Sequence, residues 1–210
     1  MGDEFRGISN DSRWKRRFPA SLSNDVSLPG YLVTRPDSAG ALMPPRLRGK
    51  WALGITPRNF TWILKDKLAV CERPGGYGEN HRRVRRQEEI IWIRENGFGC
   101  LISIIPAPHN LHNYDELGVS YRHRPFTGED LAPWLRSFYT ELHALLAKGT
   151  KVIVHNEEVG DRIIGIMGGY IRWSGLVEDS SQAILITERI AGRQLDPFAR
   201  EAILMAHTLR

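Results

Sequence analysis

The stretch Val152-Ile-Val-His-Asn-Glu-Glu-Val-Gly-Asp-Arg-Ile-Ile-Gly165 joins a strand-like run, a polar loop and the start of a helix. The apolar run up to His155 suits a strand that is covered on both faces of a sheet. A strand, a loop and a helix in this order direct the loop N–H groups and the positive end of the helix at one point. The stretch therefore predicts an anion site, to which Arg162 would add a planar guanidinium.

The segments around this stretch alternate between strand-like and helix-like patterns. Short apolar runs predict strands, and apolar residues at helical spacing predict helices. The predicted strands are 60–64, 68–71, 100–105, 119–126 and 151–155, and the predicted helices are 81–95, 131–148, 163–173, and one each after Asp179 and Asp196. Asp130, Asp179 and Asp196 are the expected N-caps. This order predicts an α/β fold of three layers, with helices flanking a mostly parallel central sheet.

The length of 210 residues allows one domain with a self-sufficient core and an extension. We expect residues 1–27 to form a basic mobile arm, 28–58 an extended segment that packs on the domain, and 59–210 the domain itself. The net charge of +5 is concentrated early, since residues 1–50 hold nine Lys or Arg against five Asp or Glu. Such an arm could touch nucleic acid weakly, although a solvated tail is its commoner role.

Cysteine and hydropathy patterns bound the class of protein. Cys71 and Cys100 are too few for a disulfide framework, and no Cys/His cluster indicates a zinc site, so we expect no metal and no cofactor. No secretion signal and no run of about 20 apolar residues is found, so we expect no membrane span. These features predict a soluble, cytoplasmic protein.

Residues 154–165 resemble the signature of the cysteine-based dual-specificity and tyrosine phosphatases, His-Cys-x5-Arg-Ser/Thr. Segments at 62–69, 113–125 and 169–183 resemble the family's opening strands, its strand before the general-acid loop and its later helices, so the resemblance extends from about residue 60 to 198. It implies the phosphatase fold, a phosphate-binding loop and a protein partner, phosphorylated or not.

The resemblance assigns roles to three loop residues. His155 takes the place of the family's loop-shaping His, and Arg162 that of its phosphate-binding Arg. Asn156 stands where the family has its nucleophilic Cys. An amide has no proton to lose near neutral pH, so the phosphocysteine intermediate of the family cannot form.

Other loop positions also depart from the family pattern. The family's Gly at the third variable position is Val159 here, with Gly160 one place later, so a positive-φ point could have moved. The Ser or Thr after the Arg is Ile163. The loop also holds three carboxylates, those of Glu157, Glu158 and Asp161. Together with Arg162 they give the loop a formal charge of −2, which disfavours phosphate.

Several roles stay open at this point. The candidates for a general acid are Glu129 and Asp130, but both lie late and Asp130 competes as an N-cap. Arg162 could be satisfied by a salt bridge to a loop carboxylate instead of a ligand. The basic cluster His81–Arg86 could be a solvated helix start or a site for an anionic ligand.

The loop predicts a pseudophosphatase, a phosphatase-like domain without phosphoryl transfer that acts as a protein-binding or regulatory module. We expect residues His155 to Arg162 to form its ligand site. One alternative is recognition of a phosphorylated ligand through Arg162 and the loop backbone. Another is a divergent phosphatase that uses a loop carboxylate as nucleophile or metal ligand, although no metal motif supports it.

Overall fold

The computed structural model describes residues 53–76 and 83–210. The arm expected at 1–27 lies outside these residues, as does the expected extended segment up to residue 52. In chain order the elements are β1 (Thr61–Leu64), β2 (Leu68–Glu72), α2 (Arg83–Glu95), β3 (Cys100–Ser103), α3 (His112–Glu116), β4 (Tyr121–His123), α4 (Leu131–Ala147), β5 (Val152–Asn156), α5 (Asp161–Trp173), α6 (Ser180–Ala191), α7 (Pro197–Met205) and the 3-10 helix η3 (Ala206–Leu209).

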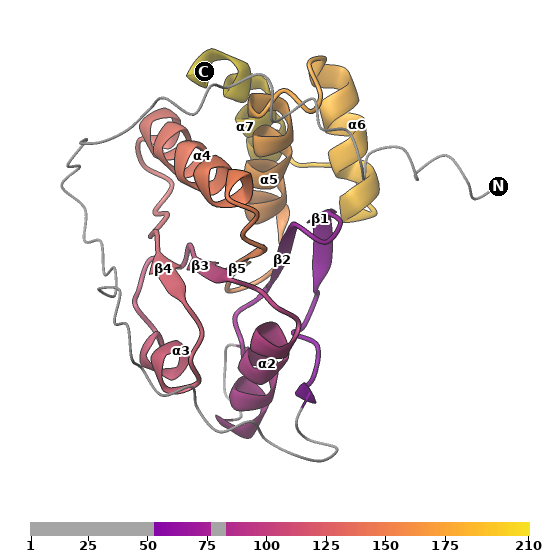
Figure 1. The fold of residues 1–210 in the computed structure, drawn as a ribbon. Helices are drawn as coiled ribbons and strands as arrows, with labels where there is room; N and C mark the ends of the chain where they lie inside the picture. Colours follow the sequence, from indigo (N-terminus) through magenta and orange to yellow (C-terminus); the bar gives the residue numbers. More distant parts are fainter. Residues whose placement is uncertain (1–52, 77–82) are drawn as a thin grey trace.

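A single sheet of five strands forms the centre of the fold, in the order β1-β2-β5-β3-β4 (Figure 1). Strand β1 runs antiparallel to β2, and every other neighbouring pair is parallel, which confirms the predicted mostly parallel sheet. The register pairs Glu72 of β2 and Ser103 of β3 with Asn156 and His155 of β5, respectively. The strand ends of β2, β3 and β5 therefore meet at one edge, where sites form in parallel α/β sheets.

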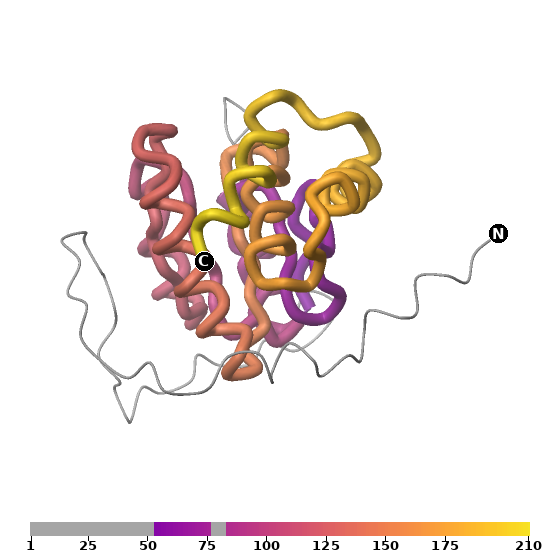
Figure 2. The backbone as a smooth tube through the Cα atoms, turned by 90° about the horizontal axis from the view of Figure 1, so that it is seen from above, coloured from indigo at the N-terminus to yellow at the C-terminus, as the bar shows by residue number. Residues whose placement is uncertain are grey.

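Helices cover both faces of this sheet, as the three-layer prediction required (Figures 1 and 2). Alternate residues of β5 enter different cores: Val152 and Val154 pack with α4, α5 and α7, whereas Ile153 packs with α2 and Tyr114. All three are fully buried. This double burial explains why the sequence of β5 is continuously apolar rather than alternating.

Helix α5 lies unusually close to its neighbours because three of its residues are glycines. A Cβ atom at Gly165 would lie 2.4 Å from the Cα of Ala199 in α7. At Gly168 it would lie 2.4 Å from Oγ1 of Thr187 in α6, and at Gly169 2.2 Å from the Tyr139 hydroxyl of α4. The close approach fixes α5, and with it the loop that precedes it.

Two of the three expected N-caps are confirmed. The carboxylates of Asp179 and Asp196 accept hydrogen bonds of 2.7 Å from the N–H groups of Gln182 and Ala199. Asp130 was wrongly predicted as a side-chain cap: it precedes α4, but its carboxylate accepts no capping hydrogen bond. Its backbone is left-handed (φ 47°), and a capping residue needs an extended backbone to aim its side chain at the first turn.

Candidate functional site

The candidate site is the loop between β5 and α5, at the middle of the sheet edge (Figure 1). The carbonyl of His155 accepts a hydrogen bond from the N–H of Ile104 (3.1 Å), and that of Asn156 accepts one from the N–H of Arg73 (2.8 Å). Both neighbouring strands thus hold the start of the loop. Gly160 is the N-cap residue of α5, so the loop 157–162 consists of four connecting residues, 157–160, and the first two residues of α5.

The backbone of this loop presents a row of hydrogen-bond donors. Among the described residues, the N–H groups from Glu157 to Arg162 donate to no protein acceptor. No residue from Asn156 to Arg162 has a positive φ, and Gly160 lies at φ −93°. The expected shift of a positive-φ point to Gly160 is therefore wrong, because the chain turns here without a left-handed residue, which also lets Val159 be accommodated. Unsatisfied N–H groups before a helix suit an anion.

His155 is completely buried and lies just before the loop, near the end of β5. Its Nε2 atom lies 3.1 Å from the hydroxyl of Tyr114, and its Nδ1 atom is buried and has no hydrogen-bond partner among the residues that the structure describes. Burial, reinforced by the positive charges of Arg73 and His123, lowers the pKa of His155 to about 3. The imidazole is therefore neutral at physiological pH, which fits a structural role better than proton transfer.

Arg162 is exposed, and its guanidinium lies over the ring of Phe126, with the central carbon 5.6 Å from the ring centroid. Within the described parts of the chain it pairs with none of the loop carboxylates, so the salt bridge considered from the sequence does not form. Phe126 is itself fixed, since its N–H donates to Ile104 O at 3.0 Å. A cation–π contact holds the guanidinium beside the loop without neutralising it.

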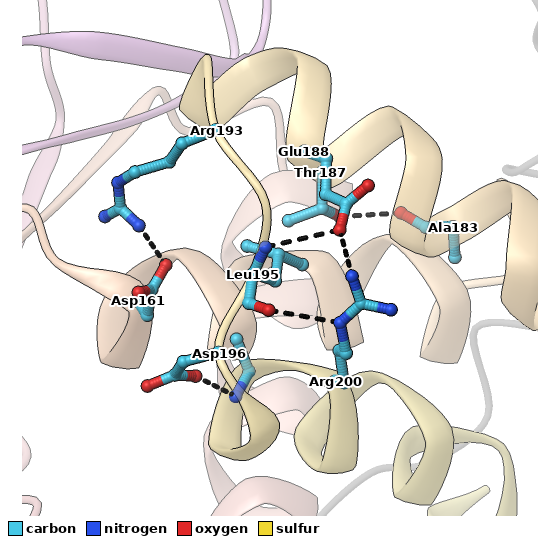
Figure 3. A network of polar contacts seen from close by, with 9 residues as sticks. Asp161, Ala183, Thr187, Glu188, Arg193, Leu195, Asp196 and Arg200 are labelled. Atoms are coloured by element: carbon cyan, nitrogen blue, oxygen red, sulfur yellow. Dashed lines mark hydrogen bonds and ion pairs between the residues drawn. The ribbon is translucent and has the colours of Figure 1, made fainter.

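Arginines from outside the loop balance two of its carboxylates. The Nε atom of Arg73 lies 2.9 Å from Oε2 of Glu157. Asp161 forms an ion pair with Arg193, which follows α6 (Figure 3). Counting these two arginines with Arg162 brings the formal charge of the assembled site from −2 to zero. The sequence-based count was incomplete because it included only residues within the loop.

The other predicted site residues lie on the surface. Glu158 is exposed. Glu129 and Asp130 are exposed before α4, and neither carboxylate makes a hydrogen bond or ion pair within the described part of the chain. The segment that leads to them does approach the loop, because Phe126 lies under Arg162.

Neither cysteine supplies a thiolate to the site. Cys71 lies in β2 and Cys100 in β3, and both side chains are buried. Burial, followed by the charges of Glu89 and Glu72, raises the pKa of Cys71, and burial raises that of Cys100 to about 11. Both thiols are therefore protonated at neutral pH and inert as nucleophiles.

The described residues form neither a metal-binding cluster nor a membrane-spanning helix. Over residues 53–76 and 83–210, no three His, Cys, Asp or Glu side chains come together as metal ligands would. Within the same ranges, no helix has the length and hydropathy needed to cross a membrane.

Comparison with known proteins gives a match in structure but not in sequence. No family model and no curated protein matches the chain. Kinase-associated phosphatase, with its catalytic-site cysteine replaced by serine, is 17% identical, covers 70% of this chain and 93% of its own, and has a TM-score of 0.58. The active form of Tk-PTP is 14% identical, with coverage of 69% and 92% and a TM-score of 0.54.

A third solved structure extends the match. The catalytic core of the PP-IP phosphatase Siw14 from S. cerevisiae is 14% identical, covers 73% of this chain and 88% of its own, and has a TM-score of 0.53. The sequence identities are low, whereas the shared elements span most of each neighbour. The chain therefore has the fold of the cysteine-based dual-specificity and tyrosine phosphatases.

Proposed function

We propose that this protein is a pseudophosphatase, a domain with the phosphatase fold that works by binding a protein partner and not by transferring phosphate. The observation that carries the proposal is Asn156, the last residue of β5. It lies directly before the loop with the N–H donors, in the place that the resemblance gives to the nucleophilic Cys. A side-chain amide cannot form a covalent phosphoenzyme.

The groups around Asn156 support this proposal, since none of them is arranged as a substitute nucleophile. Glu157 and Asp161 are engaged by arginines, and His155 is buried and neutral. Glu158 is exposed, but a carboxylate that attacks phosphate normally needs a divalent cation to offset the repulsion between anions. The site therefore favours binding over chemistry.

A specific observation favours phosphorylated ligands as the kind of partner recognised. The N–H groups of residues 157–162 have no protein acceptor among the described residues, and Arg162 is exposed beside them. Backbone N–H groups at a helix start and a guanidinium are the donors that bind phosphate most often in proteins. We propose that a phosphorylated side chain of the partner docks on this loop, with Arg162 turning from Phe126 to meet it.

Catalysis is tested with para-nitrophenyl phosphate as substrate. We expect the purified chain to release no nitrophenol above the blank, and Arg162→Met to behave identically. The variant controls for contaminating phosphatases, because residual activity that persists in Arg162→Met cannot come from this site. Turnover by the native chain that disappears in Arg162→Met would contradict the pseudophosphatase proposal.

Recognition is tested by titrating the native chain with tungstate, an oxyanion that resembles phosphate. We expect saturable binding that Arg162→Met weakens at least ~10-fold, since a hydrogen bond to a charged group contributes about 1.5–3 kcal/mol. Arg189→Met is the matched control, because Arg189 is equally exposed but lies on α6. Binding that both variants weaken equally, or no saturable binding at all, would count against an oxyanion site and leave binding of an unphosphorylated protein.

A further inference from the structure

A second arginine reaches the loop from the opposite side to Arg162. Arg73 follows directly after β2, the strand paired with β5, and its N–H donates to the carbonyl of Asn156 at 2.8 Å. Its Nε atom lies 2.9 Å from Oε2 of Glu157, the first residue of the loop. The side chain of Arg73 is 11% exposed and that of Glu157 33% exposed. The ion pair is thus built into the edge of the site.

The ion pair between Arg73 and Glu157 is not a well-aligned hydrogen bond. Nε of Arg73 and Oε2 of Glu157 are both buried, yet neither makes an aligned hydrogen bond within residues 53–76 and 83–210. The two atoms are close, but the N–H does not point along the line between them. A planar guanidinium pairs best with an oxyanion that accepts two parallel hydrogen bonds. Arg73 is therefore held by a partner that fits it poorly.

Arg86 and Glu89 are charged neighbours of Arg73 that have other partners. Burial and the nearby positive charge of Arg73 lower the pKa of Arg86, which also donates to Asn113 Oδ1 at 2.9 Å. The carboxylate of Glu89 accepts hydrogen bonds from Arg85 (2.8 Å) and from the N–H of Gly75 (2.7 Å). Among the described residues, Glu157 is therefore the carboxylate that pairs with Arg73.

We propose that Arg73 is a second cation of the oxyanion site and that Glu157 is an internal competitor for it. This inference rests on the oxyanion recognition proposed above. In the protein without ligand, the Glu157 carboxylate occupies Arg73. A bound oxyanion accepts hydrogen bonds from the loop N–H groups and displaces Glu157 from Arg73. The Glu157 carboxylate consequently weakens the binding of an oxyanion to the native loop.

Simple repulsion between Glu157 and a bound anion would also weaken binding, so the experiment must separate the two effects. Tungstate is titrated into the native chain, Glu157→Gln, Arg73→Met, and the double variant. Competition for Arg73 predicts that Glu157→Gln tightens the Kd at least tenfold in the native background. It predicts a gain below threefold in the Arg73→Met background, where the cation is absent. Repulsion alone predicts equal gains in both backgrounds.

Glu158→Gln is the matched control, because it removes the same charge from an exposed position of the same loop. We expect it to tighten the Kd less than threefold. Equal gains in the two backgrounds, or a Glu157→Gln gain no larger than that of Glu158→Gln, would overturn the inference while binding that depends on Arg162 keeps the proposed recognition intact. If neither the native chain nor Glu157→Gln binds tungstate through Arg162, both the recognition and this inference fall. Thermal melting of each variant confirms that it is folded at the temperature of the titration.

Discussion

The start and the middle of helix α5 are held in place by different forces. The middle, from Gly165 to Gly169, is fixed by contacts so close that a single methyl group would clash. The loop at its start is fixed by ion pairs to Arg73 and Arg193 and leaves its N–H groups without protein acceptors in the described part of the chain. Steric packing positions the middle of the helix, whereas ion pairs position its start. The loop residues can therefore vary while the fold is kept.

The largest effect should come from adding a methyl group to the closely packed middle of α5. In Gly165→Ala the new Cβ would meet the Cα of Ala199 at 2.4 Å and its Cβ at 2.6 Å, both on the rigid helix α7. Overpacking of this kind costs about 3 kcal/mol of unfolding free energy, because α5 and α7 must move apart. Urea unfolding, followed by tryptophan fluorescence, measures the loss.

Gly160→Ala is the control for that measurement. Gly160 has a negative φ, and a Cβ placed there meets its nearest atom, Oε1 of Glu158, only at 3.7 Å. We expect a loss of no more than ~1 kcal/mol, because Ala is a poorer N-cap than Gly but neither a close contact nor the backbone conformation excludes the methyl group. Equal destabilisation by the two substitutions would show that packing does not distinguish the middle of α5 from its start.

The fold was predictable because its signals are local. The continuous apolar run of β5 predicted a central strand that is covered on both faces. Asp179 and Asp196 predicted the starts of the helices that directly follow them. The prediction missed α3, which has only five residues and no long apolar period. It was wrong on the capping role of Asp130 because the sequence does not reveal a left-handed backbone.

The position of the candidate loop was predictable, but the charges that surround it were not. The order of strand, loop and helix located the loop, while its partners Arg73 and Arg193 come from segments far along the chain. Their proximity depends on the register of β2 against β5 and on the path of the chain after α6, which no local pattern encodes. One signal could have found Arg73: a cation directly after a predicted strand lies at the same edge as the loop.

Another prediction tests His155, the buried residue of β5 that precedes the loop. The pKa of His155 is about 3 in the folded protein, below its ordinary value of 6.5. Between these values the unfolded chain binds more protons, so this residue makes the protein less stable as the pH falls below about 6.5, by up to ~1.4 kcal/mol per pH unit. In His155→Gln this contribution should vanish, and urea unfolding at pH 7.5 and pH 5 measures it.

The comparison between the two pH values cancels the general cost of the substitution. Gln can still bond the hydroxyl of Tyr114, and other titrating groups affect native and variant chains alike. His112→Gln, at an exposed imidazole in α3, is the matched control. An unchanged pH dependence in His155→Gln would mean that the imidazole is hydrated or charged in the folded chain and does not anchor the loop as a neutral group.

The smallest effect on stability, and the clearest test of the charged end, should come from Arg193→Gln. The ion pair with Asp161 is partly exposed, with 42% of the Arg193 side chain in contact with solvent, and such pairs contribute about 0–1 kcal/mol. Losing it leaves the Asp161 carboxylate uncompensated in the first turn of α5, beside the N–H groups of the loop. We expect about threefold weaker tungstate binding at low salt and a smaller difference at high salt, because salt screens exposed charges.

Arg189→Gln is the control: it removes an exposed positive charge from α6 and should leave the Kd unchanged. If both variants weaken binding to the same extent, the net charge of the protein and not the ion pair with Asp161 determines the affinity for tungstate. The ion pair would then not distinguish the start of α5 from its middle.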